Sequence, residues 1–298
     1  MHAIIHKKMG LRSISHHICI LLWLLVSACH TKNHATHVMP WENGAICIAA
    51  HRGGYELEYE DQAPENSIAN IKNAINHGFD IYESDLRRTS DGRFIIMHDA
   101  TLDRTTNGTG RVDTLSWNAI NQYLLTFSGG ELTTEKIPLL EDFLLPSQGK
   151  IMFKFDYKAH NKYLPELIDA LIKLNLNEQI ILRFSYDQNI INEIKQYDLD
   201  DIPHILFRVE SLAQFQELKE NFKPKMISIV TRNNEFNQEH LQIIALADQA
   251  DILIEVHSFH DNDDNREHYW AKQIALPINI FHTQKPLLFQ EFLNRKKP

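Results

Sequence analysis

The sequence predicts an α/β protein in which eight parallel strands form a (β/α)8 barrel surrounded by helices, within a single domain. From residue 45 onward, short apolar runs alternate with amphipathic runs, which is the pattern of a parallel sheet covered by helices. No change of composition separates two domains, and no short repeat is present. Charged residues also follow several of the apolar runs, and the carboxyl ends of the strands form the active face of such barrels.

Nine runs have the length and composition of β-strands, which is one more than the barrel needs. The sequence does not show which of the nine lies outside the barrel. The runs cover residues 45–50, 79–85, 94–97, 151–155, 179–184, 202–207, 226–230, 252–256 and 278–281.

Runs of helical spacing fill the gaps between these strands. Ser67 can cap a helix in which Ile68, Ile71 and Ile75 share one stripe, and Gly78 can end it in a left-handed conformation. The same spacing of apolar residues predicts helices over residues 164–174, 188–196, 212–220, 240–247, 264–273 and 287–295.

Side chains alternate along a strand, so the run at residues 151–158 presents two different faces. Phe153 and Phe155 lie on an apolar face that suits packing under helices, whereas Lys154 and Asp156 lie on the other. The charged face is therefore expected to line the barrel, where charges persist only if they are paired or metal-bound. Later runs repeat this split, with Arg183, Glu255 and His257 on their polar faces.

Residues 1–28 are expected to be a lipoprotein signal peptide. Lysines and an arginine precede an apolar run at residues 18–26 that is too short to span a bilayer. The run ends in Val26-Ser27-Ala28-Cys29, which resembles the bacterial lipobox, in which cleavage leaves the cysteine as a diacylated N-terminus. The alternative is an ordinary secretory signal cleaved after Ala28.

Residues 29–44 lack apolar periodicity and are expected to form a tether between the lipid and a domain at residues 45–298. His30 stands where an aspartate would resemble an inner-membrane retention signal, so the expected location is the outer membrane, at its periplasmic face. Of the three cysteines, Cys19 would leave with the signal, Cys29 would be acylated and Cys47 would be a core residue. No intramolecular disulfide is then available.

The chain has 30 Lys and Arg against 39 Asp and Glu, for a net charge of −9. This argues against nucleic-acid binding, because neutralising phosphates along a duplex requires a basic surface. Any phosphate chemistry must therefore depend on local cations.

The strongest chemical signal is the pair Glu83 and Asp85. On a strand these two carboxylates share a face, and a divalent ion with oxygen ligands would offset their repulsion. A solvated strand face is the alternative for an isolated pair of this kind. Here, however, His51-Arg52 follows the preceding strand and His98-Asp99 follows the next one.

Six candidate residues fall at or just beyond the carboxyl ends of four successive strand runs: His51, Glu83, Asp85, His98, Asp156 and Lys158. They include two imidazoles that can exchange a proton near neutral pH, three carboxylates for a metal and a fixed cation. Cleavage of a phosphodiester needs these groups: cations for the non-bridging oxygens, an acid for the leaving oxygen and a base for the nucleophile.

At these residues the sequence resembles the glycerophosphodiester phosphodiesterase family. Several motifs occur in order over some ninety residues. They are His51-Arg52-Gly53, Pro64-Glu65-Asn66-Ser67, Glu83-Ser84-Asp85, Thr89-Ser90-Asp91-Gly92, His98-Asp99, Leu102-Asp103-Arg104-Thr105-Thr106-Asn107-Gly108-Thr109-Gly110 and Ile137-Pro138-Leu139-Leu140-Glu141.

The resemblance implies a TIM barrel that binds one divalent ion, Ca²⁺ or Mg²⁺. It implies that Glu83, Asp85 and Asp156 hold the ion, with Glu65 beside it. It also implies that His51 and His98 are the acid/base pair, and that Arg52 and Lys158 lie near the phosphate.

The chain departs from the family pattern in three places. Asp156 stands where the family usually has Glu, one methylene longer. Val256-His257 and Thr283-Gln284-Lys285-Pro286 replace the usual Trp-Thr and Thr-Asp-x-Pro, and residues 54–63 form a long acidic segment. His257, His260 and His268 lack a supporting carboxylate pattern and are expected at the surface or in loops.

Three functions are consistent with these features. The leading hypothesis is metal-dependent hydrolysis of a glycerophosphodiester to glycerol 3-phosphate and an alcohol. A related phospholipase, of the D type or the phosphatidylinositol-specific C type, is the second. The third is a non-catalytic barrel that binds lipid head groups, although such a protein would not need two acid/base histidines.

Overall fold

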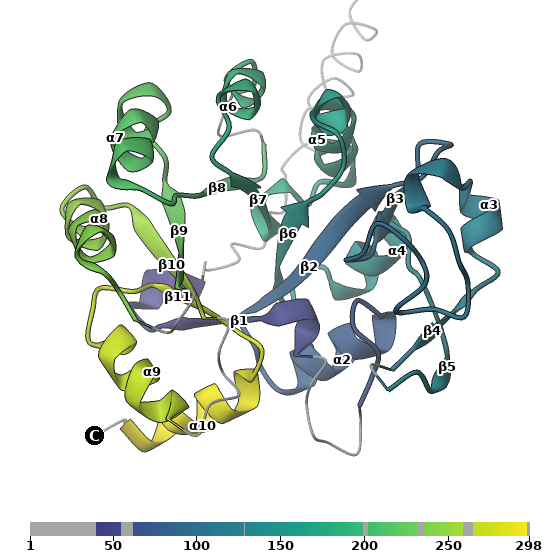
Figure 1. Ribbon diagram of the computed structural model, residues 1–298, viewed down its shortest axis with the longest axis horizontal. Helices are drawn as coiled ribbons and strands as arrows, with labels where there is room; N and C mark the ends of the chain where they lie inside the picture. The colour runs from purple at the N-terminus through teal and green to yellow at the C-terminus, as the bar shows by residue number, and fades with distance from the viewer. Residues whose placement is uncertain are drawn as a thin grey trace, which may run out of the picture. The chain divides into compact units, whose positions relative to one another are not determined.

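The protein forms a closed barrel of eight parallel strands, surrounded by helices and built as one domain (Figure 1). The computed structural model describes residues 40–54, 62–127, 129–198, 202–231, 235–258 and 265–296. The expected signal peptide, most of the expected tether and most of the acidic segment at residues 54–63 lie outside these ranges.

The barrel strands follow one another around the ring in chain order, and β1 pairs with both β11 and β2 to close it. Every pairing between these strands is parallel. The strands are β1 (Cys47–Ala50), β2 (Ile81–Arg88), β6 (Met152–Tyr157), β7 (Ile180–Ser185), β8 (His204–Arg208), β9 (Met226–Thr231), β10 (Leu253–Ser258) and β11 (Ile280–Thr283).

All nine predicted strands are present, and the extra one is β3 (Phe94–Ile96). It pairs antiparallel with the carboxyl end of β2, where β2 extends beyond the barrel, so it cannot belong to the ring. A second small sheet, β4 (Leu124–Thr126) and β5 (Leu132–Lys136), was not predicted. Along β5, exposed residues alternate with half-buried ones, and no residue of this strand is fully buried.

Helices surround the strands, as Figure 1 shows. Ser67 caps α2 through a hydrogen bond from Asn70 N, and Gly78 follows this helix with a φ of +72°, both as predicted. Within the described residues, the α-helices are α2 (Ile68–Asn76), α3 (Trp117–Ile120), α4 (Leu140–Leu144), α5 (Leu164–Leu174), α6 (Gln188–Ile194), α7 (Leu212–Asn221), α8 (Gln238–Asp248), α9 (Arg266–Ile274) and α10 (Pro286–Lys296).

The two faces of each strand build two different cores. Phe153, Phe155 and Leu182 belong to the large core between the strands and the helices. Met152 and Ile181 belong to a smaller cluster that also contains Cys47 and Ile280 and fills one end of the barrel interior. Lys154 and Asp156 share the face of Met152, and Arg183 shares the face of Ile181. These charged residues therefore face inward, as the strand pattern predicted.

Cys47 is a buried core residue, as expected, and burial raises the pKa of its thiol to about 12. At the carboxyl end of the expected tether, Pro40–Asn43 forms a short 3-10 helix. Trp41 packs against the inner cluster and contacts the His204 ring with a centroid distance of 5.8 Å. None of the helices in the described ranges is long and apolar enough to cross a membrane.

Candidate active site

The first element of the site is the turn that follows β1, where His51, Arg52 and Gly53 form a short 3-10 helix. Arg52 has a left-handed backbone, with a φ of 48°, and its main-chain N–H donates to Oε2 of Glu83 at 3.1 Å. Gly53 must lack a side chain, because a Cβ atom there would lie 1.7 Å from Oδ1 of Asn70. Such conformations cluster at functional sites. In this protein, the left-handed conformation of Arg52 places its main-chain N–H against the Glu83 carboxylate on the neighbouring strand.

Glu83 and Asp85 lie on the inner face of β2 and are both buried. Ser84, on the opposite face, donates to Oδ1 of Asn66 and so ties β2 to the turn before α2. Asp85 is in register with Asp156 on β6, which places the third predicted carboxylate beside the pair. The structure thus brings the three predicted carboxylates to adjoining positions on β2 and β6.

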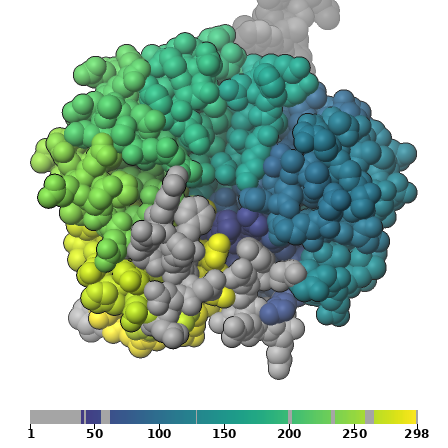
Figure 2. All heavy atoms as spheres, in the orientation of Figure 1, coloured from purple at the N-terminus to yellow at the C-terminus, as the bar shows by residue number. Residues whose placement is uncertain are grey.

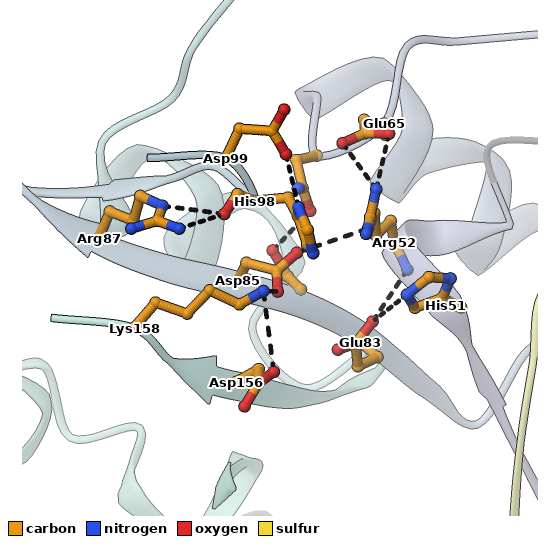
Figure 3. A network of polar contacts seen from close by, with 12 residues as sticks. His51, Arg52, Glu65, Glu83, Asp85, Arg87, His98, Asp99, Asp156 and Lys158 are labelled. Atoms are coloured by element: carbon orange, nitrogen blue, oxygen red, sulfur yellow. Dashed lines mark hydrogen bonds and ion pairs between the residues drawn. The ribbon is translucent and has the colours of Figure 1, made fainter. Parts of the chain in front are cut away.

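Asp85 is held between two cations (Figure 3). Its Oδ1 lies 2.9 Å from the Lys158 ammonium group, and its Oδ2 lies 3.6 Å from Nε of Arg52. Burial and the charge of Glu83 nevertheless raise the pKa of Asp85 to about 6. The positive charge of Arg52 and Lys158 is therefore not enough to hold the pKa of Asp85 at its ordinary value.

This carboxylate pair fits a divalent ion. Oδ2 of Asp85 is buried and accepts no hydrogen bond from the described residues. Buried anionic oxygens are costly unless a cation or a donor satisfies them. Oxygen ligands with high local negative charge are those that Ca²⁺ and Mg²⁺ prefer.

Asp156 is more exposed to solvent than Glu83 and Asp85, with 28% of its side chain accessible. Its Oδ1 is 3.1 Å from Nη1 of Arg183, and its Oδ2 is 3.9 Å from the Lys158 ammonium group. Arg183 points inward from β7, as the strand pattern predicted, and its position opposite Asp156 follows from the register of β6 and β7. The shorter acid at this position is thus paired with a buried guanidinium group.

Glu65 has a different environment from the other three acids. Arg52 donates to both of its oxygens at 3.1 Å, and Arg104 donates to them at 3.1 and 2.8 Å. In this arrangement Glu65 holds the guanidinium group of Arg52 beside Asp85. Arg104 was not among the predicted site residues, although it lies within the motif that carried the resemblance.

The two predicted acid/base histidines have unlike surroundings. His51 is buried, with Nε2 3.9 Å from Oε2 of Glu83, and burial lowers its pKa to about 3. His98 is one-third exposed, and its Nδ1 lies 2.6 Å from Oδ1 of Asp99. Hydrogen bonds from Arg104 and His98 hold the pKa of Asp99 well below its usual range, so Asp99 stays ionised beside His98.

A cluster of polar side chains lies in the barrel interior next to the site. The sequence placed Lys154 and Glu255 on inward faces but did not predict His282. Lys154 is fully buried, forms an ion pair with Glu255, and lies 3.0 Å from Nδ1 of His282. Glu255 also accepts a hydrogen bond from Ser228 at 2.7 Å. Nε2 of His282 in turn lies 3.5 Å from Oε2 of Glu83.

His282 was not predicted, because the run assigned to the last strand ended at Phe281 and β11 continues to Thr283. The signal was available: Ile280 and His282 alternate, and an extended strand places both inside the barrel. The expectation that His257 lies at the surface or in a loop is wrong. It is buried near the end of β10, with its ring stacked on that of His282 at a centroid distance of 3.7 Å.

His51, His257 and His282 come close enough to share a metal ion, with ligand atoms within 4.8 Å of one another. Burial lowers the pKa of His257 and of His282, so both rings are neutral. However, an ammonium group cannot accept a hydrogen bond, so Nδ1 of His282 accepts from Lys154 and its Nε2 carries the proton. The carboxylate pair therefore suits a cation better than the histidine cluster does.

The sequence profile of the glycerophosphoryl diester phosphodiesterase family matches residues 51–285, a span that includes all of the predicted site residues. The chain belongs to this family. This family member is 31% identical over 188 residues to Glycerophosphodiester phosphodiesterase 1 of Bos taurus, covering 60% of this chain and 54% of the bovine protein. It is 32% identical over 165 residues to a glycerophosphodiester phosphodiesterase of Caldanaerobacter subterraneus, covering 53% of this chain and 63% of that protein.

The chain thus spans between about half and two thirds of the length of these relatives. Solved glycerophosphodiester phosphodiesterase structures share its fold. A glycerophosphoryl diester phosphodiesterase from Parabacteroides distasonis superposes with a TM-score of 0.74 at 20% identity, covering 85% of this chain and 87% of that one. An Oleispira antarctica phosphodiesterase, solved with its product sn-glycerol-3-phosphate, gives 0.67 at 22% identity, covering 85% and 99%.

Proposed function

We propose that the protein hydrolyses glycerophosphodiesters to glycerol 3-phosphate and an alcohol. The observation that supports this most directly is the convergence, in a member of this family, of two histidines, buried acids and cations at one end of the barrel. Figure 2 shows the face seen in Figure 1, with atoms of the N-terminal part of the domain, in purple, at its centre. The product complex of the Oleispira protein supports the same substrate class.

In this proposal the two histidines have opposite roles. His51 is neutral near pH 7, because its pKa is lowered to about 3, so a ring nitrogen can accept a proton from the attacking water. His98 lies beside the ionised Asp99, with Nδ1 2.6 Å from Oδ1, and is assigned as the acid that donates a proton to the leaving alcohol oxygen. Arg52 and Lys158 lie on two sides of Asp85 and would neutralise the non-bridging phosphate oxygens.

We further propose that Glu83, Asp85 and Asp156 hold one divalent ion, Ca²⁺ or Mg²⁺, with Glu65 beside it. When bound, such an ion polarises the phosphoryl group and offsets the charge that develops in the transition state. The residues of the chain position it: the Arg52 N–H fixes Glu83, and β6 sets Asp156 beside Asp85. Glu65 orients Arg52.

The location of the protein belongs to the same proposal. We propose that residues 1–28 are removed as a lipoprotein signal peptide and that acylated Cys29 anchors the domain to the outer membrane, at its periplasmic face. The support is the apolar run that ends in Val26-Ser27-Ala28-Cys29, because two acyl chains anchor stably where one does not.

A comparison of two substrates tests the function. Purified protein should release glycerol 3-phosphate from glycerophosphocholine when Ca²⁺ or Mg²⁺ is supplied and should lose this activity in a chelator. Lysophosphatidylcholine, which keeps one acyl chain, serves as the second substrate. Faster cleavage of the lysolipid would favour the phospholipase hypothesis, and no cleavage of either compound with any divalent ion would contradict the proposal.

A further inference from the structure

A pocket of about 300 Å³ opens beside the active site, at the carboxyl ends of β2 and β6. Most of its lining side chains are basic or polar. Its charged side chains are Arg87, Arg88, Arg111, Lys158, Lys162 and Asp113.

Five of these charged groups are cationic and one is anionic. Three cations have carboxylate partners: Arg88 with Glu166 at 2.8 Å, Arg111 with Asp113 at 2.7 Å and Lys158 with Asp85 at 2.9 Å. The chain as a whole carries a net charge of −9. A basic pocket in this protein is therefore a local feature and not a consequence of its overall charge.

The other two cations, Arg87 and Lys162, have no carboxylate at ion-pair distance among the described residues. Arg87 donates to the main-chain oxygen of His98 at 2.9 and 2.6 Å, and Lys162 lies over the Tyr163 ring at 4.7 Å. The Arg87 side chain is half-buried, so water solvates its guanidinium group only in part. An anion in the pocket would give both cations a partner.

The pocket is continuous with the proposed site of chemistry. Lys158 contacts Asp85 and also lines the pocket, so it is shared by both. Glu83, Asp85 and Arg87 alternate along one face of β2, so Arg87 extends the line of active-site residues outward. Figure 3 shows Arg87 and Lys158 on the same side of His98.

We propose that this pocket binds a second anionic group, a phosphate carried by the alcohol part of the substrate. The inference deepens the proposed function and rests on it, because His98 as the acid for the leaving oxygen places the alcohol on the Arg87 side of the site. Guanidinium groups match phosphate oxygens in pairs of hydrogen bonds, and ammonium groups add point charge. The preferred substrates are then glycerophosphodiesters whose alcohol is itself phosphorylated.

The test uses two compounds that differ by one phosphate: glycerophosphoinositol and glycerophosphoinositol 4-phosphate. With the concentration of free divalent ion held constant, the wild-type protein should show a kcat/KM about tenfold higher for the phosphorylated compound, as expected for charge-assisted hydrogen bonds to one phosphate. This preference should decrease as salt is added. Equal kcat/KM values for the two compounds would overturn the proposal.

The double variant Arg111→Gln/Lys162→Gln removes two lining cations that have no role in the proposed chemistry. It should lose most of the preference while glycerophosphoinositol hydrolysis stays within about twofold of wild type. The matched control is Arg295→Gln/Lys173→Gln, because Arg295 forms a comparable exposed pair with Glu267 at 2.5 Å and Lys173 is exposed on α5. A preference that persists in the first variant, or is lost equally in the control, would count against the pocket.

Two further measurements separate the alternatives. If neither compound is hydrolysed, the proposed function fails, and calorimetric binding then tests the pocket alone. Tighter binding of the phosphorylated compound to wild type than to the double variant supports the anion pocket. Equal binding to the two proteins overturns it. Inorganic phosphate is the second probe. If inorganic phosphate inhibits wild type but not the double variant, with an inhibition constant as low as the dissociation constant of the phosphorylated compound, the pocket binds a free anion and the proposal is overturned.

Discussion

The ammonium group of Lys154 lies 3.0 Å from Nδ1 of His282, inside the barrel and out of contact with solvent. Lys154 also forms an ion pair with Glu255, so the buried charge is neutralised. Because Lys154 can only donate, the Nε2–H of His282 is directed toward Oε2 of Glu83, 3.5 Å away. The buried Lys154–His282 contact thus orients His282 toward Glu83, one of the carboxylates of the proposed ion site.

Lys154→Met should destabilise the fold, because it leaves Glu255 buried without its cation. Removing one partner of a buried ion pair typically costs about 3–5 kcal/mol of unfolding free energy. Denaturant unfolding followed by circular dichroism would measure this loss. Lys154→Met/Glu255→Gln removes both charges and keeps an acceptor for Ser228, so it should recover most of the stability. A single variant as stable as wild type would contradict the buried pair.

The ionisation of Asp85 should link ion binding to pH. Burial and Glu83 raise its pKa from 3.8 to about 6, so the folded state holds this proton more tightly than the unfolded state does. The contribution of the protonated group to stability is present below pH 3.8 and is lost as the pH rises through about 6. The free energy of unfolding of ion-free protein should therefore fall across this window.

A divalent ion needs the ionised carboxylate, so its apparent affinity should rise by up to about tenfold per pH unit below pH 6 and level off above it. Calorimetric titration with Ca²⁺ between pH 5 and pH 8 would measure this dependence. Asp85→Asn is the control, which should abolish it. An affinity independent of pH in wild type would show that Asp85 is not a ligand.

Asp156 tests the third carboxylate. Asp156→Asn should weaken ion affinity and lower activity, because it removes one of three negative charges near the ion. Asp156→Glu restores the family's usual residue and should keep or improve activity. We expect Ca²⁺ to be tolerated at least as well as Mg²⁺, since Ca²⁺ accepts ligands over a wider range of distances. Wild-type activity and affinity in Asp156→Asn would make Glu65 the next candidate.

His51→Ala and His98→Ala should each reduce kcat by about 10²–10⁴-fold and leave the circular dichroism spectrum unchanged, as expected for general acid/base groups. The wild-type pH profile should be bell-shaped, because the two imidazoles need opposite protonation states. Surface His268→Ala is a suitable control, since this side chain is exposed on α9. A folded variant with turnover within a few-fold of wild type would remove that histidine from the mechanism.

Cys29→Ser should move the protein from the membrane fraction to the soluble fraction without changing its specific activity, because the proposed acylation site is lost. Cell fractionation with an antibody against the barrel domain would detect the shift. Cys47→Ser is the matched cysteine control and should leave the distribution unchanged, since Cys47 is buried in the barrel. Membrane retention of Cys29→Ser would show that something other than acylation holds the protein.

The sequence by itself determined the barrel, the nine strands and the positions of the predicted site residues at strand ends. It could do so because strand periodicity is local: Lys154, Asp156 and Arg183 alternate with apolar residues, and each had to face inward. The motif around Glu83 and Asp85 is local as well, since two residues on one strand share a face wherever the strand is placed.

Only the tertiary structure decided which cations meet which acids, because those distances depend on strands that are far apart in the chain. Lys154 and Glu255 are 101 residues apart and meet across the barrel interior. The same holds for His282, which reaches Glu83 only because β11 closes the ring beside β1. The extra strand could not be recognised either, because β3 resembles a barrel strand in composition and only its antiparallel pairing with the end of β2 excludes it from the ring.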